Sequence, residues 1–216
     1  MMKTPQMQTW SGEFGKTYTE RNRFASYEEY DRLYVERFGM HRSEMSALHL
    51  DQLPRDSRIL EVGCNIGNQL FGLGHDGFES LYGVELQHDA VVAVHQERPE
   101  LNVIQGSAFD IPFKDGFFDL VFTNNVLIHI APNDLPNVMD EMVRVSRDYI
   151  WGSEYFAPEI TEVPYRGHSS LLWKADYGQL FLDRFPELEL VNWRELEYQD
   201  GSGLVDKMYL LRKRKS

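Results

Sequence analysis

Four residues between a short apolar run and a helical pattern have the types and spacing that hold a polar ligand. The run "RILEV" leads into a stretch with Glu61, Gly63, Asn65 and Gly67. Glycine at 63 allows a sharp turn and glycine at 67 lets the next helix pack closely, so backbone amides stay exposed at the strand end. About twenty residues on, Glu85 ends a second apolar run, where a carboxylate can accept hydrogen bonds from both hydroxyls of a ribose. Together these residues predict a nucleoside-binding site.

Two classes of cofactor use this layout, and the glycines distinguish them. A dinucleotide site requires G-x-G-x-x-G, but counting from Gly63 puts Asn65 and Asn68 at the second and third glycine positions. The pattern E-x-G-x-N-x-G instead resembles motif I of the class I S-adenosylmethionine (SAM) dependent methyltransferases, and Glu85 resembles their ribose-binding acid. Asparagine tolerates a positive φ, so Asn65 is a mild replacement for the middle glycine. The resemblance implies SAM as the cofactor, S-adenosylhomocysteine as the product, and no metal.

Further segments resemble the same class and extend the implied cofactor site. "GSAFDIPF" (106–113) resembles its adenine loop, with Ser107 where Asp is commoner. "FDLVFTNNVLIHI" (118–130) resembles its fourth strand, which ends near the methyl group of the cofactor, and Asn124 is our candidate there. Cys64 is expected to pack under the cofactor as a small residue, because direct displacement needs no nucleophile. The implied cofactor-binding residues are Tyr18, Arg21, Glu61, Gly63, Cys64, Asn65, Gly67, Asn68, Glu85, Leu86, Ser107, Ala108, Phe109 and Asn124.

Six segments spread over the chain also resemble a narrower family, the methylases associated with pseudaminic acid biosynthesis. They are "WSGEFGKTYTERN", "EVGCNIGNQL", "GSAFDIPFKDGFFDLVFTNNVLIHI", "YIWGSEYF", "YRGHSSLLWK" and "VDKMYLLRK". This resemblance implies methyl transfer to a hydroxyl of a nonulosonic acid, a nucleotide sugar or a precursor in bacterial surface glycan biosynthesis. It does not name the methylated atom, so N-methylation of an amino sugar or another small amine stays open.

Three residues are candidates for the acid–base chemistry, because a hydroxyl acceptor needs a base whereas an amine needs only to arrive unprotonated. His129 follows the fourth predicted strand and is the candidate base; the alternative is a hydrogen-bonded histidine that shapes the pocket. His168 lies in a loop that can fold over the strand ends, against the alternative of a solvent-facing side chain. Glu154 ends the fifth predicted strand, where parallel sheets gather ligands, against an ordinary capping or core role.

Four residues after the fourth predicted strand are candidates for binding the acceptor. Arg166 and Lys174 lie in one loop region of an acidic protein, and a guanidinium with a nearby ammonium suits a carboxylate or phosphate. The alternative is a pair of surface ion pairs with neighbouring acids. Tyr155 lies at a strand end, and Trp173 can stack on a sugar face, although a core indole is the simpler interpretation. We therefore expect a small, anionic acceptor.

The stretch from Trp10 to Asn22 carries large aromatic and polar side chains before the first predicted strand. Class I methyltransferases place this segment over the SAM pocket, so the resemblance implies that Trp10, Phe14 and Tyr18 exclude water. Tyr18, Arg21 and Asn22 are then the groups that can reach the methionine carboxylate, for which motif I offers no cation. The alternative is a tail packed on the outside of the domain.

The apolar periodicity predicts the elements that position these groups. Five β-rich runs alternate with helical segments, which predicts a parallel sheet covered on both faces. The runs are Arg58 to Val62, Ser80 to Leu86, Asn102 to Gly106, Phe117 to Asn124 and Tyr149 to Phe156. The helical segments are Ser26 to Gly39, Arg42 to Leu53, Asn68 to His75, Asp89 to Arg98, Asn133 to Ser146 and "ADYGQLFLDRF". Two closing strands joined by the turn Gln199 to Gly203 predict an antiparallel edge and complete a Rossmann-like α/β fold with seven strands.

Composition bounds the remaining questions. The 216 residues fit one structural domain, which we divide into an N-terminal helical cap (1–53) and a methyltransferase domain (54–216). A net charge of -12 disfavours nucleic acid and anionic membranes as partners. One cysteine cannot form an internal disulfide, no apolar run approaches the roughly 18 residues of a spanning helix, and the N-terminus lacks a signal-peptide layout. We therefore predict a cytoplasmic protein and leave its oligomeric state open.

The sequence thus predicts a SAM-dependent methyltransferase that acts on a small polar acceptor. Two rival hypotheses come from other classes. A non-catalytic SAM- or nucleotide-binding module would regulate a glycan pathway and lack a coherent acceptor pocket. A nicotinamide oxidoreductase would bind NAD and not SAM.

Overall fold

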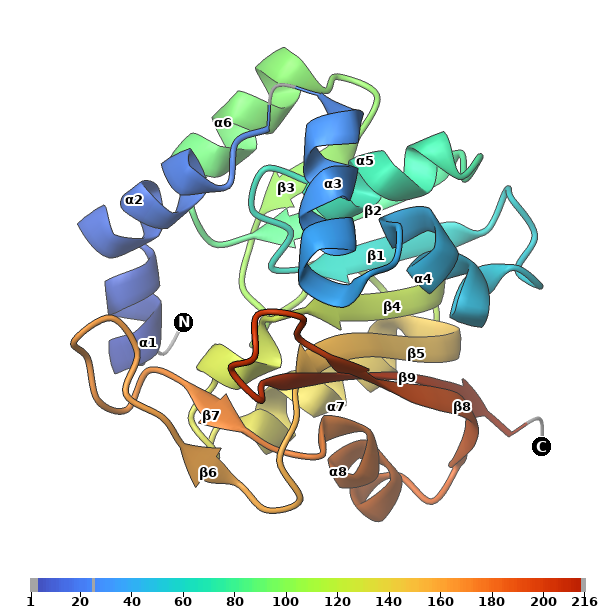
Figure 1. Ribbon diagram of the computed structural model, residues 1–216. Helices are drawn as coiled ribbons and strands as arrows, with labels where there is room; N and C mark the ends of the chain where they lie inside the picture. Colours follow the sequence, from blue (N-terminus) through green and yellow to red (C-terminus); the bar gives the residue numbers. More distant parts are fainter. Residues whose placement is uncertain (1–3, 25, 215–216) are drawn as a thin grey trace.

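A seven-stranded sheet forms the centre of the molecule, in a computed structural model that describes residues 4–24 and 26–214 (Figure 1). Its strands are β1 (Arg58–Val62), β2 (Ser80–Glu85), β3 (Asn102–Gln105), β4 (Phe118–Asn124), β5 (Ser146–Tyr155), β8 (Leu188–Glu197) and β9 (Val205–Lys213). Their order is β3-β2-β1-β4-β5-β9-β8. The first five strands pair in parallel, so their carboxyl ends meet at one edge of the sheet. The predicted fold class is confirmed.

The closing hairpin differs in one detail from the antiparallel edge that the sequence predicted. β9 pairs antiparallel with β5 on one side and with β8 on the other, so the antiparallel strand is second from the edge. The burial of the two strands explains this order. β9 carries a run of buried side chains from Met208 to Leu211, whereas most of β8 is partly or fully exposed. The more apolar strand therefore takes the inner place.

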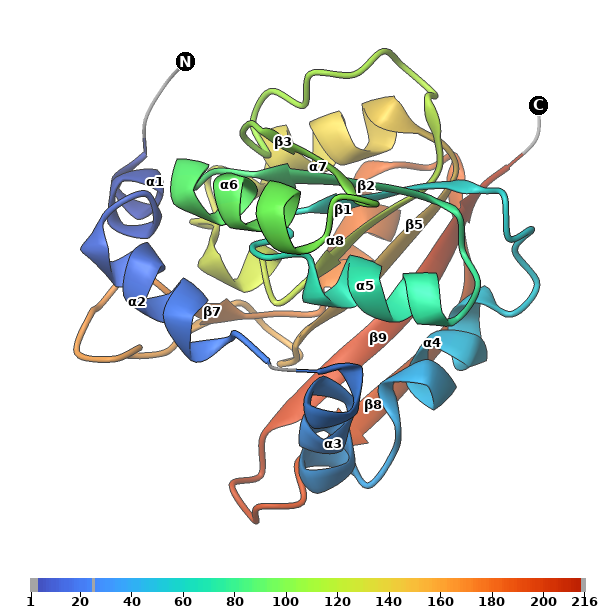
Figure 2. The same ribbon diagram turned by 90° about the horizontal axis from the view of Figure 1, so that it is seen from above.

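Helices cover both faces of the sheet, because neighbouring residues of each strand point to opposite faces. On one face, α3 (Tyr27–Phe38), α4 (Arg42–Leu50), α5 (Asn68–His75) and α6 (His88–Glu97) pack in one core with side chains such as Ile59. On the other face, α7 (Leu135–Val145) and α8 (Tyr177–Arg184) pack with side chains such as Leu60. Figure 2 shows α3, α4 and α5 on one side of the sheet and α7 on the other. The strand ends are therefore the open part of this layered structure.

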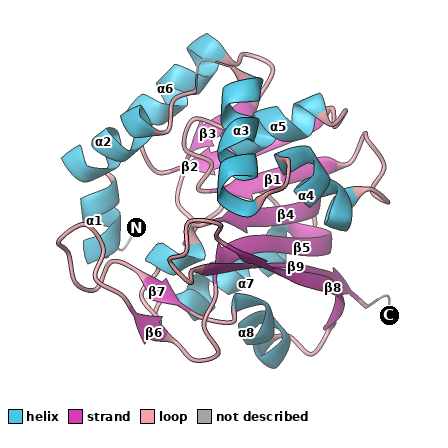
Figure 3. Ribbon diagram, viewed as in Figure 1, coloured by secondary structure: helices cyan, strands magenta, loops and turns pink. Residues whose placement is uncertain are grey.

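Two further segments flank the edge where the parallel strands end. At the N-terminus, α1 (Pro5–Trp10) and α2 (Glu13–Arg21) form two short helices; residues 1–3 of the predicted cap lie outside the described residues. Between β5 and α8, β6 (Thr161–Glu162) and β7 (Trp173–Lys174) form a small antiparallel ladder apart from the main sheet (Figure 3). The sequence analysis treated this second segment as a loop. A hydrogen bond of 3.0 Å from the Gln6 side chain to the Ser170 carbonyl joins the two segments.

Candidate functional site

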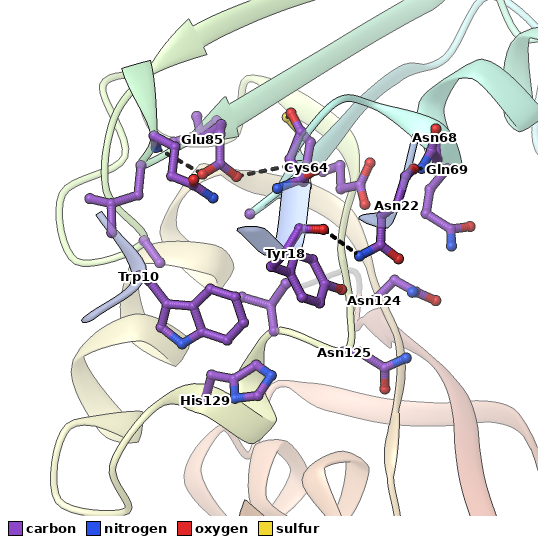
Figure 4. Close-up of a pocket in the computed structure, with 18 of the residues that line it drawn as sticks. Trp10, Tyr18, Asn22, Cys64, Asn68, Gln69, Glu85, Asn124, Asn125 and His129 are labelled. Carbon is purple, nitrogen blue, oxygen red and sulfur yellow. Dashed lines mark hydrogen bonds between the residues drawn. The ribbon is translucent and has the colours of Figure 1, made fainter. Parts of the chain in front are cut away.

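A cavity of about 220 Å³ opens at the carboxyl ends of β1, β2 and β4. The two N-terminal helices and α3 complete its wall, so helices from outside the parallel sheet cover the strand ends. Figure 4 shows Trp10, Tyr18 and His129 close together on one side and Glu85 on another. The cavity brings together thirteen of the predicted site residues: Tyr18, Glu61, Gly63, Cys64, Asn65, Asn68, Glu85, Leu86, Ser107, Ala108, Phe109, Asn124 and His129.

The turn after β1 has the backbone geometry that its residue types predict. Gly63, Asn65 and Gly67 have φ angles of 75°, 49° and 72°, all in the left-handed region. A Cβ at Gly63 would lie 2.8 Å from a methyl carbon of Val126, and one at Gly67 would lie 2.9 Å from Leu101. Glycine is thus required twice for close approach as well as for the turn. Asn65 adopts the left-handed conformation that the E-x-G-x-N-x-G interpretation expects.

The Glu85 carboxylate is held rigidly at the end of β2. One oxygen accepts a hydrogen bond of 2.8 Å from the backbone N–H of Asn65, and the other accepts one of 2.8 Å from the backbone N–H of Gln87. Burial raises the pKa of Glu85, and these backbone hydrogen bonds oppose that shift. The Leu86 backbone amide and the Gln87 side chain also lie within reach of this carboxylate, which lines the cavity. The geometry suits the two adjacent hydroxyls of a ribose.

Two buried acceptor atoms beside this carboxylate lack a hydrogen-bond partner among the described residues. They are Oε2 of Glu61 and Oδ1 of Asn65, both on residues that line the cavity. Burial raises the pKa of Glu61 well above its ordinary value, although Arg42 nearby opposes this. A buried acceptor without a partner costs roughly 1–3 kcal/mol, so both atoms favour a ligand rich in N–H or O–H donors.

Side chains after β2 and β3 form an apolar wall of the cavity, with one hydroxyl. Leu86, Ala108 and Phe109 line it, and the Ser107 hydroxyl accepts a hydrogen bond of 3.2 Å from the Phe109 amide. The Ser107 proton is therefore left for a ligand acceptor. Cys64 packs against Gly83, where an added Cβ would lie 2.5 Å from its sulfur, and burial raises the pKa of its thiol. A raised pKa keeps this thiol protonated and fits a packing role.

His129 is buried against the cavity, and a hydrogen bond fixes which of its ring nitrogens carries the proton. It lies in a 3-10 turn (Leu127–His129) after β4, and 9% of the residue is exposed. Its Nδ1 lies 2.7 Å from the Leu171 carbonyl oxygen, which can only accept, so Nδ1 carries the proton and Nε2 holds a lone pair. Burial lowers the pKa of His129 to about 4, and the hydrogen bond to Leu171 opposes this only in part. The ring is therefore neutral near pH 7.

Glu154 does not line the cavity, contrary to the acid–base role that its strand-end position suggested. Its carboxylate accepts hydrogen bonds of 3.2 Å from the Val126 amide and 3.4 Å from the Ile128 amide. Burial raises its pKa to about 7, and the hydrogen bonds from these backbone amides oppose the shift. Glu154 thus supports the turn that carries His129.

The other candidates for acceptor binding lie outside the cavity wall. Arg166 and His168 are exposed at the tip of the loop between β6 and β7, where Arg166 has a φ of 50°. Trp173 is buried and its carbonyl accepts a hydrogen bond from Tyr177, so the core interpretation of its indole holds. Lys174 pairs with Thr161 in the small ladder, and Tyr155 packs its ring against Tyr198, 6.1 Å between centroids. None of these five residues lines the cavity.

The N-terminal helices dock directly on the turn after β1. The side-chain amide of Asn65 donates a hydrogen bond of 2.7 Å to the Thr19 hydroxyl, and the side-chain amide of Asn68 donates one of 2.8 Å to the Asn22 backbone carbonyl. Trp10 stacks obliquely on His129, 4.5 Å between ring centroids, and lies edge-on to Tyr18 at 5.1 Å. These contacts place aromatic rings over the cavity.

Arg21, in contrast, is exposed and does not line the cavity, so its expected contact with the cofactor carboxylate is absent from this arrangement. Two polar side chains that were not among the predicted site residues do line it, a cation and an amide. Arg37 reaches the cavity from α3, and Asn125 reaches it from the end of β4. Nothing in the local pattern marks Arg37, whereas Asn125 stands next to the selected Asn124.

The part of the chain that matches known proteins contains the parallel strands. Residues 60–148, from within β1 to within β5, match the family model described as a methyltransferase domain. A putative methyltransferase from Encephalitozoon cuniculi is 31% identical over 106 residues, covering 46% of this chain and 47% of the relative. The chain spans less than half the length of the curated relatives that it matches.

Solved structures share the fold over most of the chain. A SAM-dependent methyltransferase from Methanosarcina mazei superposes with a TM-score of 0.62 and 16% identity, covering 77% of this chain and 96% of that one. Residues 60–148 are therefore similar to a methyltransferase domain. The [4+2]-cyclase SpnF also superposes, with a TM-score of 0.65 and 15% identity over 88% of this chain and 83% of that one. At such identities the likeness shows the fold alone, so the acceptor has to be argued from the site.

The residues that line the cavity fit SAM. The Glu85 carboxylate suits the ribose, and the unpartnered acceptors of Glu61 and Asn65 suit the amino group and other donors of the cofactor. Among residues 4–24 and 26–214, no group of three or more His, Cys, Asp and Glu side chains is placed to hold a metal ion. Within the same ranges, no helix is both long and apolar enough to cross a membrane.

Proposed function

We propose that the protein is a SAM-dependent methyltransferase that methylates a small polar acceptor, a hydroxyl of a nonulosonic acid, nucleotide sugar or precursor in bacterial surface glycan biosynthesis. The observation that carries the methyl transfer is a single cavity that holds both Glu85, fixed for a ribose, and the neutral ring of His129. The glycan acceptor rests on the sequence resemblance to methylases associated with pseudaminic acid biosynthesis. The cytoplasmic location stays a prediction from the sequence.

SAM supplies a methyl group already activated on a sulfonium, so the protein has mainly to position the acceptor and exclude water. We assign the ribose to Glu85, the cofactor's amino group to Glu61, and the adenine to the wall that includes Ser107. Asn124, the last residue of β4, lies where the resemblance places the reacting methyl group.

His129 orients the acceptor in this proposal. Its Nε2 lone pair accepts a hydrogen bond from the acceptor hydroxyl and takes up the proton as the oxygen is methylated. The Leu171 carbonyl fixes the tautomer, and Glu154 fixes the turn, so the ring is placed from two sides. An amine acceptor is the second candidate, since the low pKa of His129 makes it a weak base and a neutral amine needs none.

We also propose that residues 1–53 act as a cap on the methyltransferase domain of residues 54–216, with α1 and α2 as the part that opens. The hydrogen bonds from Asn65 to Thr19 and from Asn68 to Asn22 join the two parts and support a cap docked on the domain. Deleting residues 1–22 is then expected to weaken SAM binding in a domain that still unfolds cooperatively. Unchanged SAM affinity would mean that the two helices do not contribute to cofactor binding.

The test of the function is incubation with methyl-labelled SAM and a panel of nonulosonic acids, their nucleotide-activated forms, their precursors and matched amines, followed by mass spectrometry. A labelled product whose fragments place the methyl on oxygen supports the proposal, and one methylated on nitrogen supports the second candidate. SAM binding in calorimetry without any product would support the non-catalytic module. NAD binding without SAM binding would support the oxidoreductase.

A further inference from the structure

One part of the cavity wall has polar groups that the proposed cofactor contacts do not use. Arg37 contributes from α3 and Asn125 from the end of β4. In Figure 4, Asn125 and Glu85 lie on opposite sides of Tyr18, so the amide is remote from the proposed ribose site. These two side chains come from different elements, and the fold alone brings them to one cavity.

Asn125 brings a polar side chain to the cavity wall from a constrained backbone position. Its backbone adopts a φ of 54°, and its N–H donates a hydrogen bond of 2.9 Å to the Ser153 carbonyl. Its side-chain amide lies near the Asp206 carboxylate. The Oδ1 of Asn125 is left buried without a partner among the described residues. This oxygen is therefore an acceptor for a donor of a ligand.

Asp206 is itself held from the opposite side. It is 2% exposed, and the Tyr198 hydroxyl donates a hydrogen bond of 3.2 Å to its Oδ1. Both residues belong to the closing hairpin, which packs beside β5 and away from β1 and β2, where the cofactor contacts lie.

Arg37 presents a guanidinium to the same cavity, with the buried Asp206 carboxylate among the charges that act on it. It lies 5.5 Å from the centre of the Tyr198 ring, so the stacking fixes the side chain without using its N–H donors. Across residues 4–24 and 26–214, no carboxylate forms an ion pair or hydrogen bond with it. A partly buried guanidinium with free donors is suited to a carboxylate, which it can hold with two parallel hydrogen bonds.

We propose that Arg37 and Asn125 form the acceptor subsite, which takes a ligand with a carboxylate for Arg37 and a hydroxyl or N–H donor for the Oδ1 of Asn125. This inference rests on the proposed methyl transfer and makes the acceptor an acid. It moves the anion-binding role from Arg166 and Lys174, which lie outside the cavity, to Arg37. Among the described residues, Arg37 is the one cation that lines the cavity, so the SAM affinity of its variant separates this role from a contact with the carboxylate of the cofactor.

The test uses N-acetylneuraminate and its methyl ester as probes, because the ester lacks only the negative charge. Calorimetry is done on the full chain saturated with S-adenosylhomocysteine. We expect the wild type to bind the acid at least tenfold more tightly than the ester. Arg37→Gln should abolish that difference while changing the Kd of SAM by less than threefold, and Arg32→Gln, exposed on the same helix, should behave as the wild type.

Asn125→Gly provides an independent measurement, because glycine keeps the positive φ while removing the amide. It should weaken the acid and the ester alike, by about tenfold. Equal affinity for acid and ester in the wild type, or binding of neither, would overturn the subsite. So would an Arg37→Gln protein that loses SAM affinity tenfold but still discriminates between the probes. Each of these results leaves methyl transfer standing if SAM binds, whereas loss of SAM binding in the wild type would defeat the proposed function itself.

Discussion

The buried neutral ring of His129 predicts an acid-labile contribution to stability. Burial lowers the pKa of His129 from 6.5 to about 4. Between these two values the native state binds fewer protons than the unfolded state, so the free energy of unfolding falls as the pH falls through this window. The contribution of a neutral His129 is complete above pH 6.5 and is lost by about pH 4.

The size of the effect follows from the two pKa values. A full pKa difference is worth about 1.4 kcal/mol for each pH unit, which gives about 3 kcal/mol between pH 7 and pH 4. Integrating the linkage relation places about 2 kcal/mol of this loss already at pH 5. The ring is 9% exposed, so solvent screening reduces the figure little.

The measurement compares urea unfolding of the wild type and His129→Gln at several pH values from 5 to 7.5. Glutamine keeps a donor for the Leu171 carbonyl but does not titrate, so the difference between the two proteins isolates His129. His49, whose pKa burial also lowers to about 4, titrates in both proteins and cancels. We expect the wild type to lose about 2 kcal/mol more than the variant between pH 7 and pH 5. Parallel curves would refute the burial of a neutral ring beneath Trp10.

Three further predictions concern the cofactor contact of Glu85, the cover over His129 and the support of the turn that carries it. Glu85→Gln should raise the Kd of SAM roughly tenfold to hundredfold in calorimetry, because a hydrogen bond to a charged group is worth about 1.5–3 kcal/mol. Glu79→Gln, exposed and directly before the same strand, is the control. Trp10→Ala should raise the pKa of His129 toward 6.5 in an NMR titration by exposing the ring, and a pKa that stays near 4 would contradict the cover. Glu154→Gln should lower the free energy of unfolding by about 1–3 kcal/mol in urea unfolding, with SAM affinity within threefold of wild type, because it disturbs the acceptor of the Val126 and Ile128 amides; unchanged stability would argue against this support.

The sequence predicted the parallel part of the fold closely because local pattern and tertiary burial agree there. The structure places β1 at Arg58–Val62 and α5 at Asn68–His75, as predicted, and ends β2 one residue earlier. Strands buried on both faces appear as short apolar runs, and the intervening glycines mark the turn. The cofactor side of the cavity follows directly, because it is built from residues adjacent to those strand ends.

The acceptor side was less predictable because its residues come together only in three dimensions. Arg37, Arg166 and Lys174 are equivalent cations in the sequence, and α3 alone brings Arg37 to the cavity. Glu154 ends a strand, as a ligand-binding residue would, but the free amides of the turn at His129 take its carboxylate. Such partner choices depend on contacts distant in the chain, which no local spacing encodes.

The stretch from Trp10 to Asn22 links the two sides of the cavity physically. Toward the cofactor side, Thr19 is hydrogen-bonded to Asn65 of the turn that shapes the proposed SAM site. Toward the acceptor side, Phe14 lies edge-on to the rings of Tyr165 and His168, and Trp10 covers His129. Any opening that admits an acceptor to His129 past Trp10 of α1 therefore disturbs the contact of Trp10 with Tyr18 of α2, the helix that also holds Asn65. Exclusion of water from the base and retention of the cofactor are in this way properties of one segment.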